Sequence, residues 1–159
     1  MNTLRRSFLE FTGTSLATVG ALTTLAGAGF LKTTQAAAAA WNKAGFESKA
    51  VAEAIKSLGA GSAADSRDIV ITAPDIAENG AVVPIEVVSR IPNTQSIAII
   101  AEKNPFPLAA TMDFANNAEP YAYVRIKMGQ TSNVRAIVKA DGKFFTAAKE
   151  VKITVGGCG

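Results

Sequence analysis

The chain has 159 residues with one cysteine and no histidine, which excludes a Cys/His zinc site and any Ser-His-Asp or Cys-His catalytic pair within the chain. Its 16 Lys and Arg exceed its 13 Asp and Glu, but Arg5, Arg6 and Lys32 lie with only Glu10 in the first 39 residues, so the remainder is close to neutral at +1. Without a concentrated basic face, the sequence gives no support to nucleic-acid binding.

The first 39 residues have the features of an export signal. Arg5 and Arg6 stand in a short polar start, followed by an apolar stretch over residues 16–31 and then by a run of alanines. The segment Leu-Arg-Arg-Ser-Phe-Leu-Glu at residues 4–10 resembles the twin-arginine export motif. We therefore predict a twin-arginine signal peptide.

A transmembrane anchor is the alternative to a cleaved signal, because residues 13–31 are nearly long enough to span a bilayer. Threonines and glycines dilute this stretch, and the alanines after it offer Ala-x-Ala cleavage sites. We expect cleavage between Ala37 and Ala40, which leaves no membrane anchor. The chain then divides into a signal peptide at about residues 1–39, one domain at 40–155 and a C-terminal arm at 156–159.

The domain is expected to begin with a single helix over residues 47–58. Its apolar residues fall three to five positions apart, on one side of a helix. Ser48 is a candidate N-cap and Gly59 a C-terminal stop. We expect the apolar side to pack on the domain or on a partner. Residues 59–66, rich in small side chains, are predicted to be a linker.

From Asp68 onward, short β-branched runs alternate with turn signals. Pro84 favours an edge or a bulge, while Asn79-Gly80 predicts a turn and Asp141-Gly142 a tight hairpin. The pattern is typical of a mainly β fold, an immunoglobulin-like antiparallel β-sandwich with an N-terminal helix. The cysteine pair of antibody domains is missing from the sequence, so this likeness concerns architecture only. Strands are expected at residues 69–72, 82–88, 96–102, 121–127, 134–139, 143–146 and 151–155.

The chain ends in Gly156-Gly157-Cys158-Gly159. Glycine is costly to order, so we expect a flexible arm that carries the thiol about 10 Å beyond Val155 at about 3.5 Å per residue. Cys158 has no neighbouring cation or helix N-terminus to favour its thiolate, and the terminal carboxylate disfavours it. This thiol is therefore a poor autonomous nucleophile and a better covalent carrier, loaded and unloaded inside other enzymes.

Other interpretations stay open from the residues alone. The tail could be a disordered end with an incidental thiol, or Cys158 could only join copies of an exported immunoglobulin-like interaction module through a disulfide. A thiol-dependent enzyme is a more distant third. The segment Asn-Pro-Phe-Pro at residues 104–107 predicts a rigid turn rather than a recognition loop, and Arg125 and Lys127 are expected on a solvated strand face.

Several of these segments together resemble the SoxY family, the sulfur-carrier subunits of the bacterial Sox thiosulfate-oxidising system. The C-terminal segment is the most specific, although family members commonly end in Gly-Gly-Cys-Gly-Gly and this chain stops one glycine short. The resemblance is carried by the twin-arginine signal, Val83-Pro84-Ile85, residues 102–107 (Glu-Lys-Asn-Pro-Phe-Pro), residues 123–127 (Tyr-Val-Arg-Ile-Lys) followed by Thr131-Ser132, and residues 151–159.

The resemblance implies that Cys158 is the site of covalent substrate attachment and that Gly156, Gly157 and Gly159 form its swinging arm. In the family, a haem enzyme joins the cysteine sulfur oxidatively to thiosulfate, and a manganese-containing hydrolase then releases sulfate. The resemblance also implies a heterodimer with a SoxZ-like β-sandwich subunit and a periplasmic location reached by the twin-arginine route. By the same resemblance, the haem and the manganese belong to the partner enzymes and not to this chain. The chain itself is expected to carry covalent sulfur adducts without cofactor or metal, and not to be an enzyme.

Overall fold

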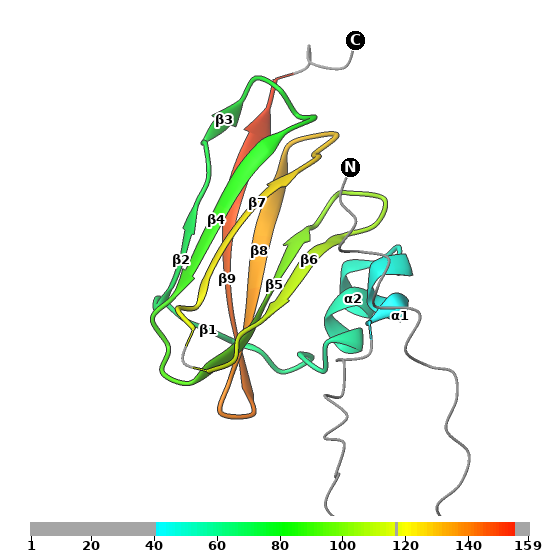
Figure 1. The fold of residues 1–159 in the computed structure, drawn as a ribbon. Helices are drawn as coiled ribbons and strands as arrows, with labels where there is room; N and C mark the ends of the chain where they lie inside the picture. Colours follow the sequence, from blue (N-terminus) through cyan, green and yellow to red (C-terminus); the bar gives the residue numbers. More distant parts are fainter. Residues whose placement is uncertain (1–40, 117, 155–159) are drawn as a thin grey trace, which may run out of the picture. The chain divides into compact units, whose positions relative to one another are not determined.

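The computed structural model describes residues 41–116 and 118–154 (Figure 1). The predicted signal peptide at residues 1–39 and the predicted arm at residues 156–159 lie outside the described residues, so both boundaries stay predictions. The described part contains two helices and nine strands.

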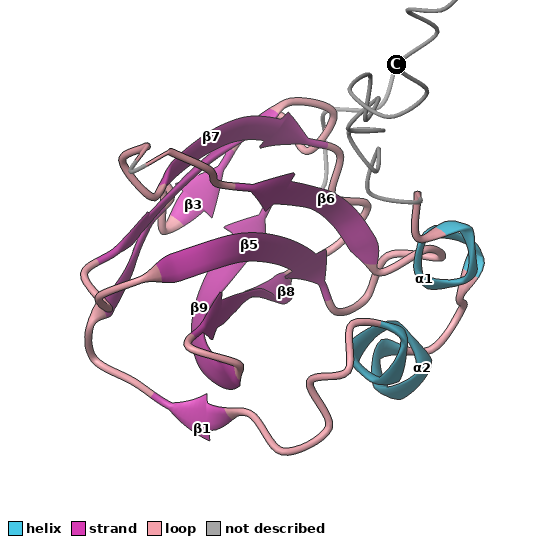
Figure 2. Cartoon of the chain, turned by 60° about the horizontal axis from the view of Figure 1, so that its bottom comes forward, coloured by secondary structure: helices cyan, strands magenta, loops and turns pink. Residues whose placement is uncertain are grey.

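The strands form two sheets that face each other (Figures 1 and 2). The larger has the order β1-β9-β8-β5-β6, with β3 also paired to β9, and the smaller has the order β2-β4-β7. The mainly β sandwich predicted from the sequence is therefore confirmed. The larger sheet consists of β1 (Ala64–Asp65), β3 (Ile76–Ala77), β5 (Thr94–Ala101), β6 (Leu108–Asp113), β8 (Ser132–Ala140) and β9 (Lys143–Ile153), and the smaller of β2 (Ile69–Thr72), β4 (Val83–Ser89) and β7 (Tyr121–Ile126).

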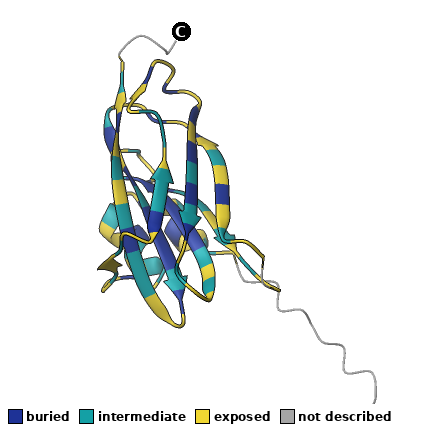
Figure 3. Cartoon of the chain, turned by 90° about the vertical axis from the view of Figure 1, so that its left-hand side faces the viewer, coloured by how far each residue is buried: buried dark blue, intermediate teal, exposed yellow. Residues whose placement is uncertain are grey.

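The main hydrophobic core lies between the two sheets. In β4 and β7, buried side chains alternate with more exposed ones, as a strand with one solvated face requires (Figure 3). In β5, residues 97–101 are all buried, so this strand is covered on both faces. The core includes Val83, Ile85 and Val87 from β4 against Ile97 and Ile99 from β5.

A second core lies on the opposite face of β5, where the helices α1 (Lys43–Glu47) and α2 (Val51–Ser57) pack. Figure 2 shows both helices beside β5 and β6. Ala54 of α2 belongs to the same buried cluster as Ala98, Ile100 and Ile137, so the helical layer covers apolar side chains of the larger sheet. No helix within the described residues is long and apolar enough to cross a membrane.

The prediction of one helix over residues 47–58 was wrong, because the chain turns at Ser48. Ser48 ends α1 instead of starting a helix: its hydroxyl and its backbone N–H both donate to the carbonyl of Gly45, at 2.6 and 3.4 Å. The N-cap of α2 is Ala50, without a side-chain cap. The predicted stop at Gly59 is confirmed by its positive φ of 75°.

The last part of the chain is also simpler than predicted. The two strands expected at residues 143–146 and 151–155 are one strand, β9, which pairs with β8 without interruption from Lys143 to Val151. The hairpin at Asp141-Gly142 is confirmed, with φ of 48° and 72°. The predicted linker at residues 59–66 contains the two-residue strand β1, and neither β3 nor β6 was predicted.

Pro84 lies in the middle strand of the smaller sheet, and the edge that the sequence predicts is present locally at this residue. β4 pairs with β7 along its length, Pro84 being opposite Arg125. On its other side, β2 pairs with β4 only from Glu86 onward. Pro84 therefore lies where β4 has a single neighbour, which is how a central strand accommodates a residue without an N–H.

Candidate functional site: the root of the C-terminal arm

The end of β9 is the part of the described structure that bears on the predicted carrier thiol. Cys158 and its glycines Gly156, Gly157 and Gly159 lie outside the described residues. Thr154 is the last residue described before them and is exposed. The site is therefore built from the residues that hold this end of β9.

Backbone contacts hold one side of this strand. The parallel strand β3 pairs with β9, Ile76 opposite Lys152 and Ala77 opposite Ile153. The N–H of Lys152 donates to Asp75 O at 3.0 Å, and the N–H of Thr154 donates to Ala77 O at 3.3 Å. The chain is thus hydrogen-bonded up to Thr154, and the four residues from there to Cys158 can span at most about 14 Å.

On the other side, a threonine hydroxyl extends the pairing beyond the end of β8. Ser132 is the first residue of β8 and lies opposite Val151. Two residues further along β9, the N–H of Ile153 donates to Oγ1 of Thr131, the residue just before β8, at 3.0 Å. The last residues of β9 are therefore hydrogen-bonded on both sides.

Gly80 packs against this held end. A β-carbon at Gly80 would lie 2.4 Å from the carbonyl oxygen of Met128 and 3.0 Å from Cγ2 of Ile153. The N–H of Met128 also donates to Gly80 O at 2.7 Å. The sequence predicted only a turn at Asn79-Gly80, and it gives no sign that glycine is needed there for a close approach to Met128.

The loop between β5 and β6 is joined to the same end of the sandwich. The N–H of Lys103 donates to Ser132 Oγ at 3.0 Å, and Asn104 Nδ2 donates to the carbonyl of Lys127 at 2.7 Å. Ala101 N donates to Pro107 O at 2.8 Å, which closes residues 104–107 into a turn as predicted. The turn leaves an aromatic side chain on the surface, because Phe106 is 51% exposed.

Exposed lysines without an ion pair outnumber such acids near the root of the arm by three to two. Lys103, Lys127 and Lys152 are all exposed and belong to the loops and strand just described, while Glu78 and Glu150 are exposed acids beside them. Among the described residues, the structure gives none of these lysines an ion pair. An anion attached to the arm would therefore meet an attractive field at distances of about a Debye length.

Two ion pairs also lie near this end. Arg135 Nη2 lies 2.7 Å from Glu102 Oε1, and both side chains are largely covered, at 27% and 20% exposure. Lys149 Nζ lies 3.0 Å from Asp75 Oδ1 and donates to Ala73 O at 2.7 Å. Within the described residues, no group of three or more His, Cys, Asp or Glu could hold a metal ion.

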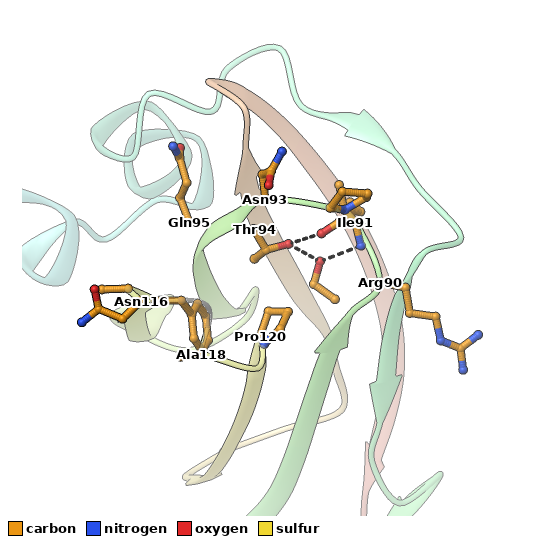
Figure 4. A pocket seen from close by; sticks show the side chains of 12 residues that line it. Arg90, Ile91, Asn93, Thr94, Gln95, Asn116, Ala118 and Pro120 are labelled. Atoms are coloured by element: carbon orange, nitrogen blue, oxygen red, sulfur yellow. Dashed lines mark hydrogen bonds between the residues drawn. The ribbon is translucent and has the colours of Figure 1, made fainter.

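A hollow of about 630 Å³ lies at the opposite end of the sandwich, between the β4–β5 and β6–β7 loops (Figure 4). The hydroxyls of Ser89 and Thr94 inside it are already hydrogen-bonded, to each other at 2.7 Å and to Ile91 O at 2.7 Å. Thr94 pairs with Ala140, near the start of β9. The 11 residues of β9 span about 33 Å, which exceeds the maximum of about 14 Å that the four residues from Thr154 to Cys158 can span.

The described residues form a β-sandwich, and its last strand is followed in the sequence by the single cysteine. The model of the family described as sulfur oxidation protein SoxY matches residues 55–158. The structure is similar to that of the sulfur carrier protein SoxY from Chlorobium limicola f thiosulfatophilum, with a TM-score of 0.58 and 36% identity over 65% of this chain and 96% of that chain. The chain belongs to the SoxY family.

Other solved structures share less with this chain. The PKD domain of an M14-like peptidase from Thermoplasmatales archaeon SCGC AB-540-F20 has a TM-score of 0.38 and 17% identity over 54% of this chain and 91% of that chain. The human F-spondin reeler domain has a TM-score of 0.41 and 9% identity over 57% and 92%. No curated protein sequence matches the chain.

Proposed function

We propose that Cys158 is the residue on which this SoxY protein carries its substrate. As a member of the SoxY family, the chain is a sulfur carrier in thiosulfate oxidation. The observation that supports Cys158 is that it is the single cysteine of the whole sequence, and that the family match extends to it. A carrier that holds sulfur on a thiol has no other thiol in this chain to use.

The chemistry proposed for this thiol is an oxidation followed by a hydrolysis. First, the Cys158 sulfur joins the outer sulfur of thiosulfate, which gives Cys-S-S-SO₃⁻ and releases the thiol proton and two electrons to a haem-containing partner enzyme. Water then attacks the terminal sulfonate at a manganese-containing partner enzyme. This cleaves the S–S bond, releases sulfate and leaves a persulfide on Cys158.

The arm would present these adducts to enzymes that dock on the sandwich. Gly156, Gly157 and Gly159 supply its flexibility, while the hydrogen bonds of Ile153 and Thr154 fix its starting point. Because only about 14 Å of chain follows Thr154, each enzyme has to bind close to this end. We infer that catalytic groups, haem and manganese come from the partner enzymes.

SoxY proteins are periplasmic components of the Sox system. We propose that this chain reaches the periplasm by the twin-arginine route, directed by Arg5 and Arg6, and that cleavage near Ala40 removes the signal. We also propose a heterodimer with a SoxZ-like β-sandwich subunit. Twin-arginine export suits such a pair, because a folded passenger carries a signal-less subunit with it.

Mass spectrometry of the intact protein from thiosulfate-grown cells tests the carrier function. We expect thiosulfonate and persulfide adducts on the wild-type protein and none on Cys158→Ser. The alternative, an exported immunoglobulin-like interaction module whose cysteine only forms an intermolecular disulfide, is not favoured by the family match. That alternative predicts only free thiol or a Cys158-linked dimer under turnover conditions, a result that would refute the carrier assignment.

A further inference from the structure

Phe106 is an exposed aromatic side chain on a turn with a restricted backbone. Its side chain is 51% exposed, whereas that of the next residue, Pro107, is fully buried. Pro105 and Pro107 fix the backbone φ on each side of Phe106, and Ala101 N donates to Pro107 O at 2.8 Å. Single exposed apolar residues are common on protein surfaces. A role for Phe106 therefore depends on how the turn is held and on its place in the fold.

Hydrogen bonds also join this turn to the neighbouring strand and loop. The N–H of Lys103 donates to Ser132 Oγ at 3.0 Å, at the start of β8. Asn104 Nδ2 donates to the carbonyl of Lys127 at 2.7 Å, just after β7. Because the turn is already ordered, little conformational entropy is lost when a partner protein covers it. Aromatic side chains are enriched at protein interfaces, and this one is presented in a fixed position.

The turn lies at the end of the sandwich where β9 ends. Figure 1 shows the β3–β4, β5–β6 and β7–β8 loops at the same end as the last residues of β9. Ser132, which accepts from Lys103, lies opposite Val151 of β9, so the turn begins two strand spacings, about 10 Å, from β9. Cys158 follows Thr154 by four residues, at most about 14 Å of chain. An enzyme that acts on Cys158 therefore has to bind against this end.

An interface of ordinary size covers both the end of β9 and the turn. Specific protein interfaces bury about 800 Å² on each partner, which is a patch about 30 Å across. Further apolar side chains are exposed at the same end. Ile76, opposite Lys152 of β9, is 58% exposed, and Val82, just before β4, is 49% exposed. The enzymes that reach the arm thus meet an apolar surface that includes Phe106.

Two exposed lysines belong to the loops that hold this turn. Lys103 precedes the turn and Lys127 accepts a hydrogen bond from it. Neither lysine has an ion pair among the described residues. Glu102, the acid next to Lys103, is taken up in an ion pair of its own, and the exposed acids Glu78 and Glu150 belong to other elements. Carboxylates of a partner protein would therefore find free lysines beside the turn.

We propose that the enzymes that act on Cys158 dock at this end of the sandwich with Phe106 as the anchor. The proposal rests on the carrier function proposed above. The complementary enzyme surface is an apolar pocket for the aromatic ring, with carboxylates at its rim opposite Lys103 and Lys127. Burial of the ring slows dissociation of the complex, whereas the lysines speed its formation.

Direct binding tests the anchor. The Cys158→Ser protein, with its partner subunit, is titrated against the purified manganese-containing enzyme. Adding Phe106→Ala should raise the dissociation constant by about 10- to 30-fold, mainly through faster dissociation, and Phe106→Tyr should restore binding. Tyr121→Ala is the matched control, because Tyr121 is 44% exposed at the opposite end of the sandwich, next to a residue that lines the hollow there. Equal dissociation constants for the two alanine variants would overturn the proposal.

Three further measurements separate this docking site from other roles. Phe106→Ala should keep the urea midpoint and still co-purify with the partner subunit, since loss of that subunit would assign Phe106 to the heterodimer and overturn the proposal. Lys103→Glu combined with Lys127→Glu should slow association by about two- to five-fold at low salt and less at high salt. An association rate that is unchanged at low salt would contradict the charged rim.

Sulfate release from the wild-type protein tests the carrier function separately. Binding that depends on Phe106 without sulfate release would support the docking site and refute the carrier role alone. Sulfate release with binding that ignores Phe106 would overturn the docking site and leave the carrier role intact.

Discussion

Thr131 accepts a hydrogen bond at its side-chain Oγ1 from the backbone N–H of Ile153, at 3.0 Å. Ile153 is the last residue of β9, whereas β8 begins only at Ser132. The hydroxyl therefore takes the place that the carbonyl of Gln130 would have if β8 began two residues earlier. It is the last contact on this side of the strand before the predicted arm.

We predict that Thr131→Val loosens the end of β9. Valine keeps the shape of threonine but cannot accept the N–H of Ile153, and the loss of one hydrogen bond costs about 1 kcal/mol. The amide of Ile153 should then exchange about five times faster with solvent deuterium. Thr131→Ser, which keeps the hydroxyl, is the control. Unchanged exchange in the valine variant would mean that the hydrogen bond does not hold the strand.

A second prediction concerns the close approach at Gly80. Gly80→Ala places a β-carbon 2.4 Å from the backbone oxygen of Met128, so the backbone has to move. We expect the free energy of unfolding to fall by about 1 to 3 kcal/mol, measured from the urea midpoint. Gly129→Ala is the matched control in the neighbouring loop, because no atom lies within 4 Å of its added carbon. Equal midpoints for the two variants would contradict the prediction.

Short sequence motifs predicted the turns and the strand faces, because these features depend on neighbouring residues. Asp141-Gly142 and Gly59 both have the positive φ that their residue types favour. The alternation of β7 gives its buried and exposed faces directly. The family resemblance rests on a run of adjacent residues at the C-terminal segment, and the role of Cys158 that it implies stays a prediction.

Contacts between distant residues could not be predicted in this way. The strand β6 has few β-branched residues, and its conformation depends on pairing with β5, where Met112 lies opposite Ile97. The strand β3 has only two residues and is fixed by β9, far along the chain. The holding of Ile153 by Thr131 likewise spans 22 residues, and no spacing rule in the sequence identifies it.

The lysines near the arm should accelerate reactions of Cys158 with anions. We predict that Lys127→Glu combined with Lys152→Glu slows reaction with the dianionic reagent 5,5′-dithiobis(2-nitrobenzoate) by about two- to five-fold at low salt, since charges about 10 Å away are only partly screened. The neutral reagent dipyridyl disulfide should react at an unchanged rate. Lys139→Glu combined with Lys143→Glu, at the hairpin end of β8 and β9 away from the arm, is the charge-matched control. An equal effect from this control pair would show that only net charge matters.

The length of the arm gives the last prediction, which rests on the proposed carrier function. Deleting Gly157 shortens the reach of Cys158 by about 3.5 Å. Alkylation by iodoacetamide should be unaffected, because a small reagent comes to the thiol. Sulfate release from thiosulfate, reconstituted with the haem and manganese enzymes, should fall by at least ten-fold, because a thiol displaced by a few ångströms loses its reactive geometry. Gly156→Ala, which reduces flexibility at constant length, separates the two properties of the arm. Full turnover by the deletion variant would contradict the prediction. It would mean that the partner enzymes reach Cys158 even when the arm is one residue shorter.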